Sequence, residues 1–150
     1  MTPSEIQKFT IEMLSKDELL TSACCRVSAM DDGSFFSDLN KAMGVGGSGI
    51  HALVSAPTFT PSSAAAKNAV GNLRLKIAVT EVPNLNRLRP GAISAADAAW
   101  HVAWLLNQTF PAGKPGPMLV LDGEIAPAVN SNGDTVTYSV PFTCMHQLKG

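Results

Sequence analysis

The chain has 150 residues, the length of one ordinary domain, and 45% of them are hydrophobic, so one core can form without disulfide or metal staples. Eleven Lys and Arg residues stand against twelve Asp and Glu residues, and the basic residues are scattered, which argues against a dedicated surface for nucleic acid or an anionic membrane. The longest apolar-rich run, AADAAWHVAWLL, falls short of the ~20 residues that a bilayer requires, so we expect one soluble domain over residues 1–150.

The first predicted helix begins at Thr2, the N-cap residue, with Pro3 at the first helical position. Glu5 lies three residues after the cap and completes a capping box, and the helix should extend to about Ser15. Its apolar stripe comprises Ile6, Phe9, Met13 and Leu14.

Residues 24–71 predict short strands and one helix, separated by glycine-rich or alanine-rich connections. Residues 24–29 are compatible with a short strand, and residues 34–43 predict a second helix. The run GVGGSG at 44–49 precedes a predicted strand within 50–60. The small and polar residues 61–71 indicate a long hairpin tip or a flexible loop.

The strongest predicted strand, which begins at Asn72, and the strongest predicted helix flank a loop. Apolar residues alternate with polar ones on that strand, and its buried face comprises Leu73, Leu75, Ile77 and Val79. Residues 81–91, EVPNLNRLRPG, contain two prolines that interrupt regular structure, so a loop is expected. Ser94 and Asp97 then make a second capping-box pattern, which opens a helix over 94–110.

The C-terminal part predicts a Pro/Gly linker at 111–117, followed by a β-hairpin with its turn at Asn132-Gly133. The inward-facing residues of its second strand are Val136, Tyr138, Val140, Phe142 and Cys144. The order of elements predicts an α+β domain, with a mainly antiparallel four- to five-stranded sheet and helices packed on one face.

Three glycines, Gly44, Gly46 and Gly49, fit the dinucleotide-binding pattern GxGxxG. That pattern works when a strand enters the glycines and a helix leaves them, with its N-terminal amides toward the pyrophosphate. Here a helix is predicted before the glycines and a strand after them. A flexible connector is therefore the favoured interpretation, and no cofactor is predicted.

The three cysteines are Cys24, Cys25 and Cys144, and because adjacent cysteines rarely bridge each other, buried free thiols are expected. A metal site formed by these thiols and His146 would lack the CxxC spacing that makes zinc sites recognisable. Simple packing of these side chains is favoured, and neither a metal site nor a catalytic site is predicted.

The helix predicted at 94–110 is apolar almost all the way round, so both its own sheet and something else should cover it. Trp100 and Trp104 lie four residues apart with no basic residue between them, which favours core or subunit contact over base stacking. His101, four residues after Asp97, predicts an ordinary ion pair on the helix surface.

The segment IAVTEVPNLNRLRPGAISAADAAWHVAWLLN, residues 77–107, resembles a pattern of tail-terminator and tail-completion proteins of tailed bacteriophages and prophages. In that family a strand ends in an acidic residue, a Pro/Asn/Asn-Arg loop follows, and a helix rich in Ala, Val and Leu comes next. The matching residues are Glu81, Pro83, Leu85, Asn86 and Arg87. Asn at position 84, the spacer RPGAI and the alanine-rich 61–71 segment depart from the pattern.

The resemblance implies a structural virion protein rather than an enzyme. It would form a homomeric ring, commonly a hexamer, at the head-proximal end of the tail tube, after assembly in the host cytoplasm. Its expected partners are the major tail tube protein and a head-tail connector or neck protein. Genomic DNA would pass through the lumen without specific binding, which suits the net charge of −1.

The same resemblance implies that the 81–90 loop and the following helix contact other subunits. Asn side chains there can cap backbone groups, and Arg87 can reach a carboxylate across an interface. The expected interface residues are Glu81, Pro83, Asn84, Asn86, Arg87, Arg89, Trp100 and Trp104. The 44–49 and 61–71 segments could become ordered on meeting a partner ring.

Two other hypotheses remain open at this stage. The first keeps the phage context and places the protein elsewhere in the neck, as a head-closure or connector-adjacent subunit. The second is a small ligand-binding or enzymatic α+β domain that uses the glycine segment and His51. The simplest alternative to all three is a stable domain whose asparagine-rich loop only turns the chain.

Overall fold

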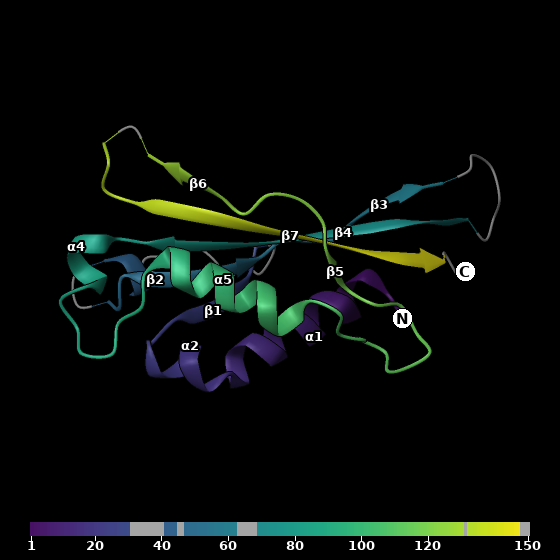
Figure 1. Cartoon of the computed structure of the whole chain (residues 1–150), viewed down its shortest axis with the longest axis horizontal. Coiled ribbons are helices and arrows are strands. Elements are labelled where there is room, and N and C mark those ends of the chain that lie inside the picture. Colours follow the sequence, from purple (N-terminus) through teal and green to yellow (C-terminus); the bar gives the residue numbers. More distant parts are fainter. Residues whose placement is uncertain (31–40, 45–46, 63–68, 131, 148–150) are drawn as a thin grey trace.

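The computed structural model describes residues 1–30, 41–44, 47–62, 69–130 and 132–147, and they form an α+β fold (Figure 1). The described helices are α1 (Pro3–Lys16), α2 (Glu18–Ser22), α4 (Pro83–Asn86) and α5 (Ala95–Leu106). The described strands are β1 (Arg26–Ala29), β2 (Ile50–Val54), β3 (Thr58–Pro61), β4 (Val70–Glu81), β5 (Val120–Leu121), β6 (Ala126–Val129) and β7 (Val136–Gln147).

These strands form one sheet, in the order β1-β2-β4-β7-β5, with β3 beside β4 and β6 beside β7. Its centre is the antiparallel pair β4 and β7, which stay in register over twelve residues. Only β1 and β2 are parallel to each other among the described pairs, so the mainly antiparallel prediction is confirmed.

The predicted count of four to five strands is wrong, because the described sheet has seven. The single strand expected within 50–60 is divided at residues 55–57, where Pro57 interrupts the ladder. β2 therefore pairs with the second half of β4, and β3 pairs with its first half. In the same way, β5 and β6 pair with different halves of β7.

Local sequence chemistry explains where the N-terminal helices begin. Thr2 caps α1, and both hydrogen bonds of the predicted capping box with Glu5 are present. The sequence prediction missed α2, which is only five residues long and too short to show a helical period. Asp17 caps α2 by accepting a hydrogen bond from the Leu20 amide at 2.9 Å.

The helix predicted at 94–110 is shorter than expected. It starts as predicted, with the Ser94 hydroxyl accepting a hydrogen bond from the Asp97 amide, but it ends at Leu106. Asn107 is already extended, and Gln108 has a φ of 62°, in the left-handed region. The Gln108 amide donates instead to the Leu119 carbonyl oxygen at 2.7 Å, so the chain leaves the helix four residues early.

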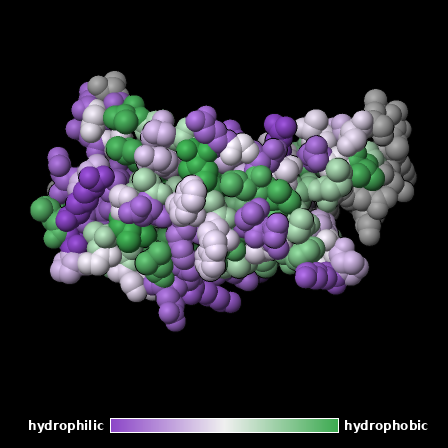
Figure 2. All heavy atoms as spheres, in the orientation of Figure 1, coloured by the Kyte–Doolittle hydropathy of each residue, from purple (hydrophilic) through white to green (hydrophobic). Residues whose placement is uncertain are grey.

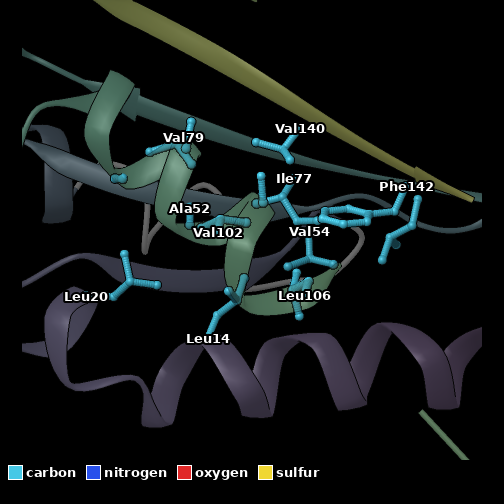
Figure 3. Close-up of a cluster of buried hydrophobic side chains, with 14 of the residues drawn as sticks. Leu14, Leu20, Ala52, Val54, Ile77, Val79, Val102, Leu106, Val140 and Phe142 are labelled. Carbon is cyan, nitrogen blue, oxygen red and sulfur yellow. The ribbon is translucent and has the colours of Figure 1, made fainter. Parts of the chain in front are cut away.

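The core lies where helices and long strands meet, and Figure 3 shows side chains from α1, α2, α5, β2, β4 and β7 pointing into one cluster. In Figure 1, α1, α2 and α5 are drawn below β4 and β7. The predicted inward positions of β4 are buried, while Arg74 and Lys76 on its other side are exposed. The labelled core residues are Leu14, Leu20, Ala52, Val54, Ile77, Val79, Val102, Leu106, Val140 and Phe142.

Several expectations fall partly outside the described residues. Residues 41–43 are helical, in agreement with the end of the helix predicted at 34–43, and the remainder of that prediction lies outside. The described part of the chain also leaves out Gly46, residues 63–68 and the side chain of His146. Within the described part of the chain, no helix is both long and apolar enough to cross a membrane.

Candidate functional site: the loop after β4 and the tryptophan face of α5

The segment predicted as a loop at 81–91, which we call the α4 loop, contains one helical turn, α4, which begins at Pro83. Val82 before it is extended, as expected for a residue that precedes proline. Proline lacks an amide hydrogen, and at the first turn of a helix that amide would have no helical partner. The turn places Asn86 back against the end of β4.

Glu81 and Asn86 form a buried polar pair inside this turn. The Asn86 side-chain amide donates to the Glu81 carboxylate at 2.7 Å and to the Ile93 carbonyl oxygen at 2.7 Å. Both residues are almost completely buried, so both hydrogens of the amide are used within the chain. This pair links the end of β4 to the segment that leads into α5, and it confirms that an asparagine in the loop caps a backbone group.

Two arginines complete the network. Arg87 donates to the other carboxylate oxygen of Glu81 at 3.0 Å, and 62% of its side chain remains exposed. Arg89 donates to the backbone oxygens of Ser48, at 3.1 Å, and Ala23, at 2.6 Å. The predicted interface arginines therefore bind partners in their own chain, and only Arg87 retains a large exposed surface.

The backbone at Gly49 packs directly against this loop. Its φ is +77°, and a Cβ added there would lie 2.6 Å from the Asn86 backbone nitrogen. The Gly49 carbonyl oxygen also accepts a hydrogen bond from the Val82 amide at 2.8 Å. Gly49 thus has a structural reason to be glycine, because the start of β2 and the α4 turn approach each other too closely for a side chain.

The two tryptophans lie on the outer side of α5. Trp100 is 74% exposed and Trp104 is 72% exposed, whereas Ala99, Val102 and Leu106 on the opposite side of the helix are buried in the core. The core alternative for the indoles is therefore wrong. A groove of about 210 Å³ runs beside them, and we call it the tryptophan groove. It is lined by Trp100, Ala103, Trp104, Asn107, Leu121 and Ile125.

His101 fixes this helix to the N-terminal helices. Its Nε2 lies 2.9 Å from the carboxylate of Asp17, the residue that caps α2. The predicted pair with Asp97 is wrong, because the His101 ring turns toward α2, where a partly buried carboxylate is available. The same ring stacks on Trp104, with centroids 5.7 Å apart. The outer face of α5 is thereby held in place by side chains on two elements.

The other candidate chemical groups are dispersed. Cys24 is exposed and not buried as expected, while Cys25 and Cys144 are buried free thiols. Burial raises the pKa of Cys25 to about 12 and also raises the pKa of Cys144. Among the described residues, no three His, Cys, Asp or Glu side chains are grouped to hold a metal ion.

The glycine segment and His51 also have places in the fold. Residues 41–43 are helical and β2 follows Gly49, so the described flanks have the reversed order that argues against a dinucleotide fingerprint. His51 is buried within β2, and its Nε2 lies 3.1 Å from the Ser28 hydroxyl oxygen of β1. It therefore belongs to the interior of the sheet.

The predicted interface residues gather in two places. Glu81, Asn86, Arg87 and Arg89 form the network around α4, and the tryptophans form the separate face of α5. Sequence reasoning missed the exposed Leu88 and the contribution of Leu121 and Ile125 to the tryptophan groove. Leu88 lies within the segment that resembles the phage family, between Arg87 and Arg89. An apolar residue between two arginines in a loop was the feature that could have indicated its exposure.

Neither a scan against models of protein families nor a search of curated proteins finds a match to this chain. The residues of the α4 loop and of α5 therefore carry the functional inference.

Proposed function

We propose that this protein is a structural subunit of a phage tail, a tail terminator or tail-completion protein that assembles into a homomeric ring. The proposal includes a tail-terminator-like arrangement with helices on one face of the sheet. The single observation that carries it is the exposure of Trp100 and Trp104 on a helix whose other side is built into the core.

The exposed indoles offer a large free energy of association. A buried aromatic side chain covers roughly 150–250 Å². With about three quarters of each indole exposed, covering both would contribute roughly 5–9 kcal/mol before the costs of association, at ~25 cal/mol per Å². Aromatic anchors of this kind dominate the energetics of protein interfaces.

The helix that carries the indoles is also held in place before any partner arrives, and the Trp104 ring stacks on His101. Val102 and Leu106 anchor α5 in the core, and the contact between His101 and Asp17 joins the helix to α2. Less conformational entropy is lost on binding when the contacting side chains are already ordered. Rigid placement of exposed aromatic groups is more typical of an assembly surface than of a substrate pocket.

The loop after β4 is equally well fixed. Its hydrogen bonds run within the chain, from Asn86 to Glu81 and from Arg89 to the backbone, so its outer residues project from a stable base. A ring of identical subunits needs two different faces that fit each other. The α4 loop and the α5 face are two such separate surfaces.

In the proposed role, a ring of this protein, with six copies expected, binds the last ring of the tail tube and stops its growth. The opposite side of the ring presents a surface to the head-tail connector or neck protein. Genomic DNA passes through the lumen, and a net charge of −1 from charges scattered along the sequence does not favour its non-specific binding. The work is structural and requires neither cofactor nor metal.

Native mass spectrometry of the purified protein, alone and with tail tube protein, tests the proposal. We expect a closed species of defined copy number that binds the ends of the tube. The variant Trp100→Ser/Trp104→Ser should remain folded and lose that species, whereas Met145→Ser, at an exposed position on β7, should retain it. A ring that binds the connector but not the tube would instead identify a different neck protein.

A further inference from the structure

We infer that Leu88 of one copy inserts into the tryptophan groove of the next copy, and that this contact joins the subunits head to tail. The inference rests on the proposed function and assigns the interface within it. The occupant of the groove is thus a second copy of this chain.

The first half of the contact is the segment 87–89, which we call the Leu88 loop. Leu88 is 83% exposed, the largest exposed fraction among the large apolar side chains of the described residues. Arg89 holds the base of this loop through hydrogen bonds to Ser48 and Ala23. An apolar side chain is therefore kept in solvent on a fixed base.

The second half of the contact is the tryptophan groove, whose volume is about 210 Å³. A cavity of about 150 Å³ lined by apolar side chains accommodates benzene, so this groove has room for the smaller isobutyl group of leucine. The indoles of Trp100 and Trp104 and the side chains of Leu121 and Ile125 offer an apolar lining. Burial of a leucine there removes apolar surface from water on both copies.

Charge complementarity favours this pairing. Asp122 and Glu124 are exposed and lie in the turn between Leu121 and Ile125, which line the groove. On the other surface, Arg87 is the immediate neighbour of Leu88 and remains 62% exposed while it contacts Glu81. An apolar centre beside a basic residue thus meets an apolar groove beside two carboxylates, which gives the contact a preferred partner and orientation.

The positions of the two surfaces set the type of assembly. Figure 1 shows the chain after α4 projecting at one end of the molecule, whereas the connection from β5 to β6 runs above α5 nearer the middle. In Figure 2 apolar and polar residues are intermixed over this side of the molecule. Because the two halves of the contact lie apart on each copy, one copy can use its Leu88 loop on one neighbour and its tryptophan groove on another, and such a heterologous contact propagates into a ring or a filament.

The first experiment compares Leu88→Ser with Met145→Ser, a control at another exposed apolar position. Burying a leucine contributes roughly 1.5–3 kcal/mol, so Leu88→Ser should raise the dissociation constant between copies roughly 10- to 100-fold. Met145→Ser should change it less than about 3-fold. Sedimentation velocity gives the constants, and circular dichroism checks that both variants fold as the wild type does.

The second experiment tests the geometry by cross-linking. In a Cys24→Ser background, the double variant Leu88→Cys/Ile125→Cys should form a ladder of covalent multimers under mild oxidation, and each single variant should not. The inference is overturned if the double variant yields no ladder. It is also overturned if the Leu88→Ser protein associates like the wild type. If the wild-type protein itself never associates, the proposed function fails; if the ring forms without Leu88, only this interface is wrong.

Discussion

Replacement of Asn86 by alanine tests the internal network of the α4 loop. The substitution removes both donors of a buried amide: one serves the Glu81 carboxylate at 2.7 Å and the other serves the Ile93 carbonyl oxygen at 2.7 Å. Each buried acceptor that loses its partner costs about 1–3 kcal/mol, and a charged acceptor costs more. We therefore expect Asn86→Ala to lower the free energy of unfolding by roughly 3–5 kcal/mol, a large part of the 5–15 kcal/mol typical of a domain.

Two neighbours in the same segment serve as controls. Asn84 is exposed in the same helical turn, so Asn84→Ala should stay within about 0.5 kcal/mol of the wild type. The Arg87 side chain is mostly exposed and solvent screens its ion pair, so Arg87→Ala should cost about 1 kcal/mol or less. Urea unfolding, followed by far-ultraviolet circular dichroism at matched protein concentration, gives the three values. If Arg87→Ala costs more than Asn86→Ala, the network does not fix the loop.

Burial alone would raise the pKa of Asp17, but hydrogen bonds from the Leu20 amide and His101 outweigh burial and lower it. Asp17→Ala should thus cost about 1 kcal/mol at pH 7, and the difference from the wild type should shrink as the pH falls below about 4, in urea titrations at several pH values. Ellman's reagent at pH 8 should label Cys24 rapidly, and should label Cys25 and Cys144 only after unfolding; fast labelling of two thiols would contradict their burial. Gly49→Ala should destabilise the fold more than Gly133→Ala does. Both glycines have a positive φ, but of the two only Gly49 has a backbone atom within 3 Å of the added Cβ. Equal melting temperatures of the two variants would refute this prediction.

Local patterns predicted the parts of the fold that depend on neighbours in the sequence. The cap at Thr2, the alternation along β4 and the start of α5 at Ser94 each arise within a few residues, and all three are present. The hairpin predicted around Asn132-Gly133 is also present, as β6 and β7. The extra strands arise differently, because β3 and β5 are short and exist by pairing with β4 or β7. A segment of two to four residues has too little periodicity to be recognised alone.

In the candidate site, too, contacts between neighbours in the sequence differ from contacts between distant segments. The residues Glu81, Asn86 and Arg87 were noted in the sequence as expected interface residues. Their contacts with one another within the chain were not predicted, although they lie within six positions of each other. The contact between Asp17 and His101 spans 84 positions, and the tryptophan groove combines α5 with residues 121 and 125. Such contacts depend on how the helices dock on the sheet, so periodicity along the chain could not reveal them.

The most direct test of the central claim uses the two tryptophans as reporters, since the chain has only two. Their emission spectrum and acrylamide quenching should be measured across a dilution series, alongside the copy number from native mass spectrometry. If a neighbouring copy covers the indoles, emission shifts to shorter wavelength and quenching falls as the ring forms. Assembly with unchanged emission and quenching, or indoles that stay accessible at every concentration with tube protein present, would contradict the claim.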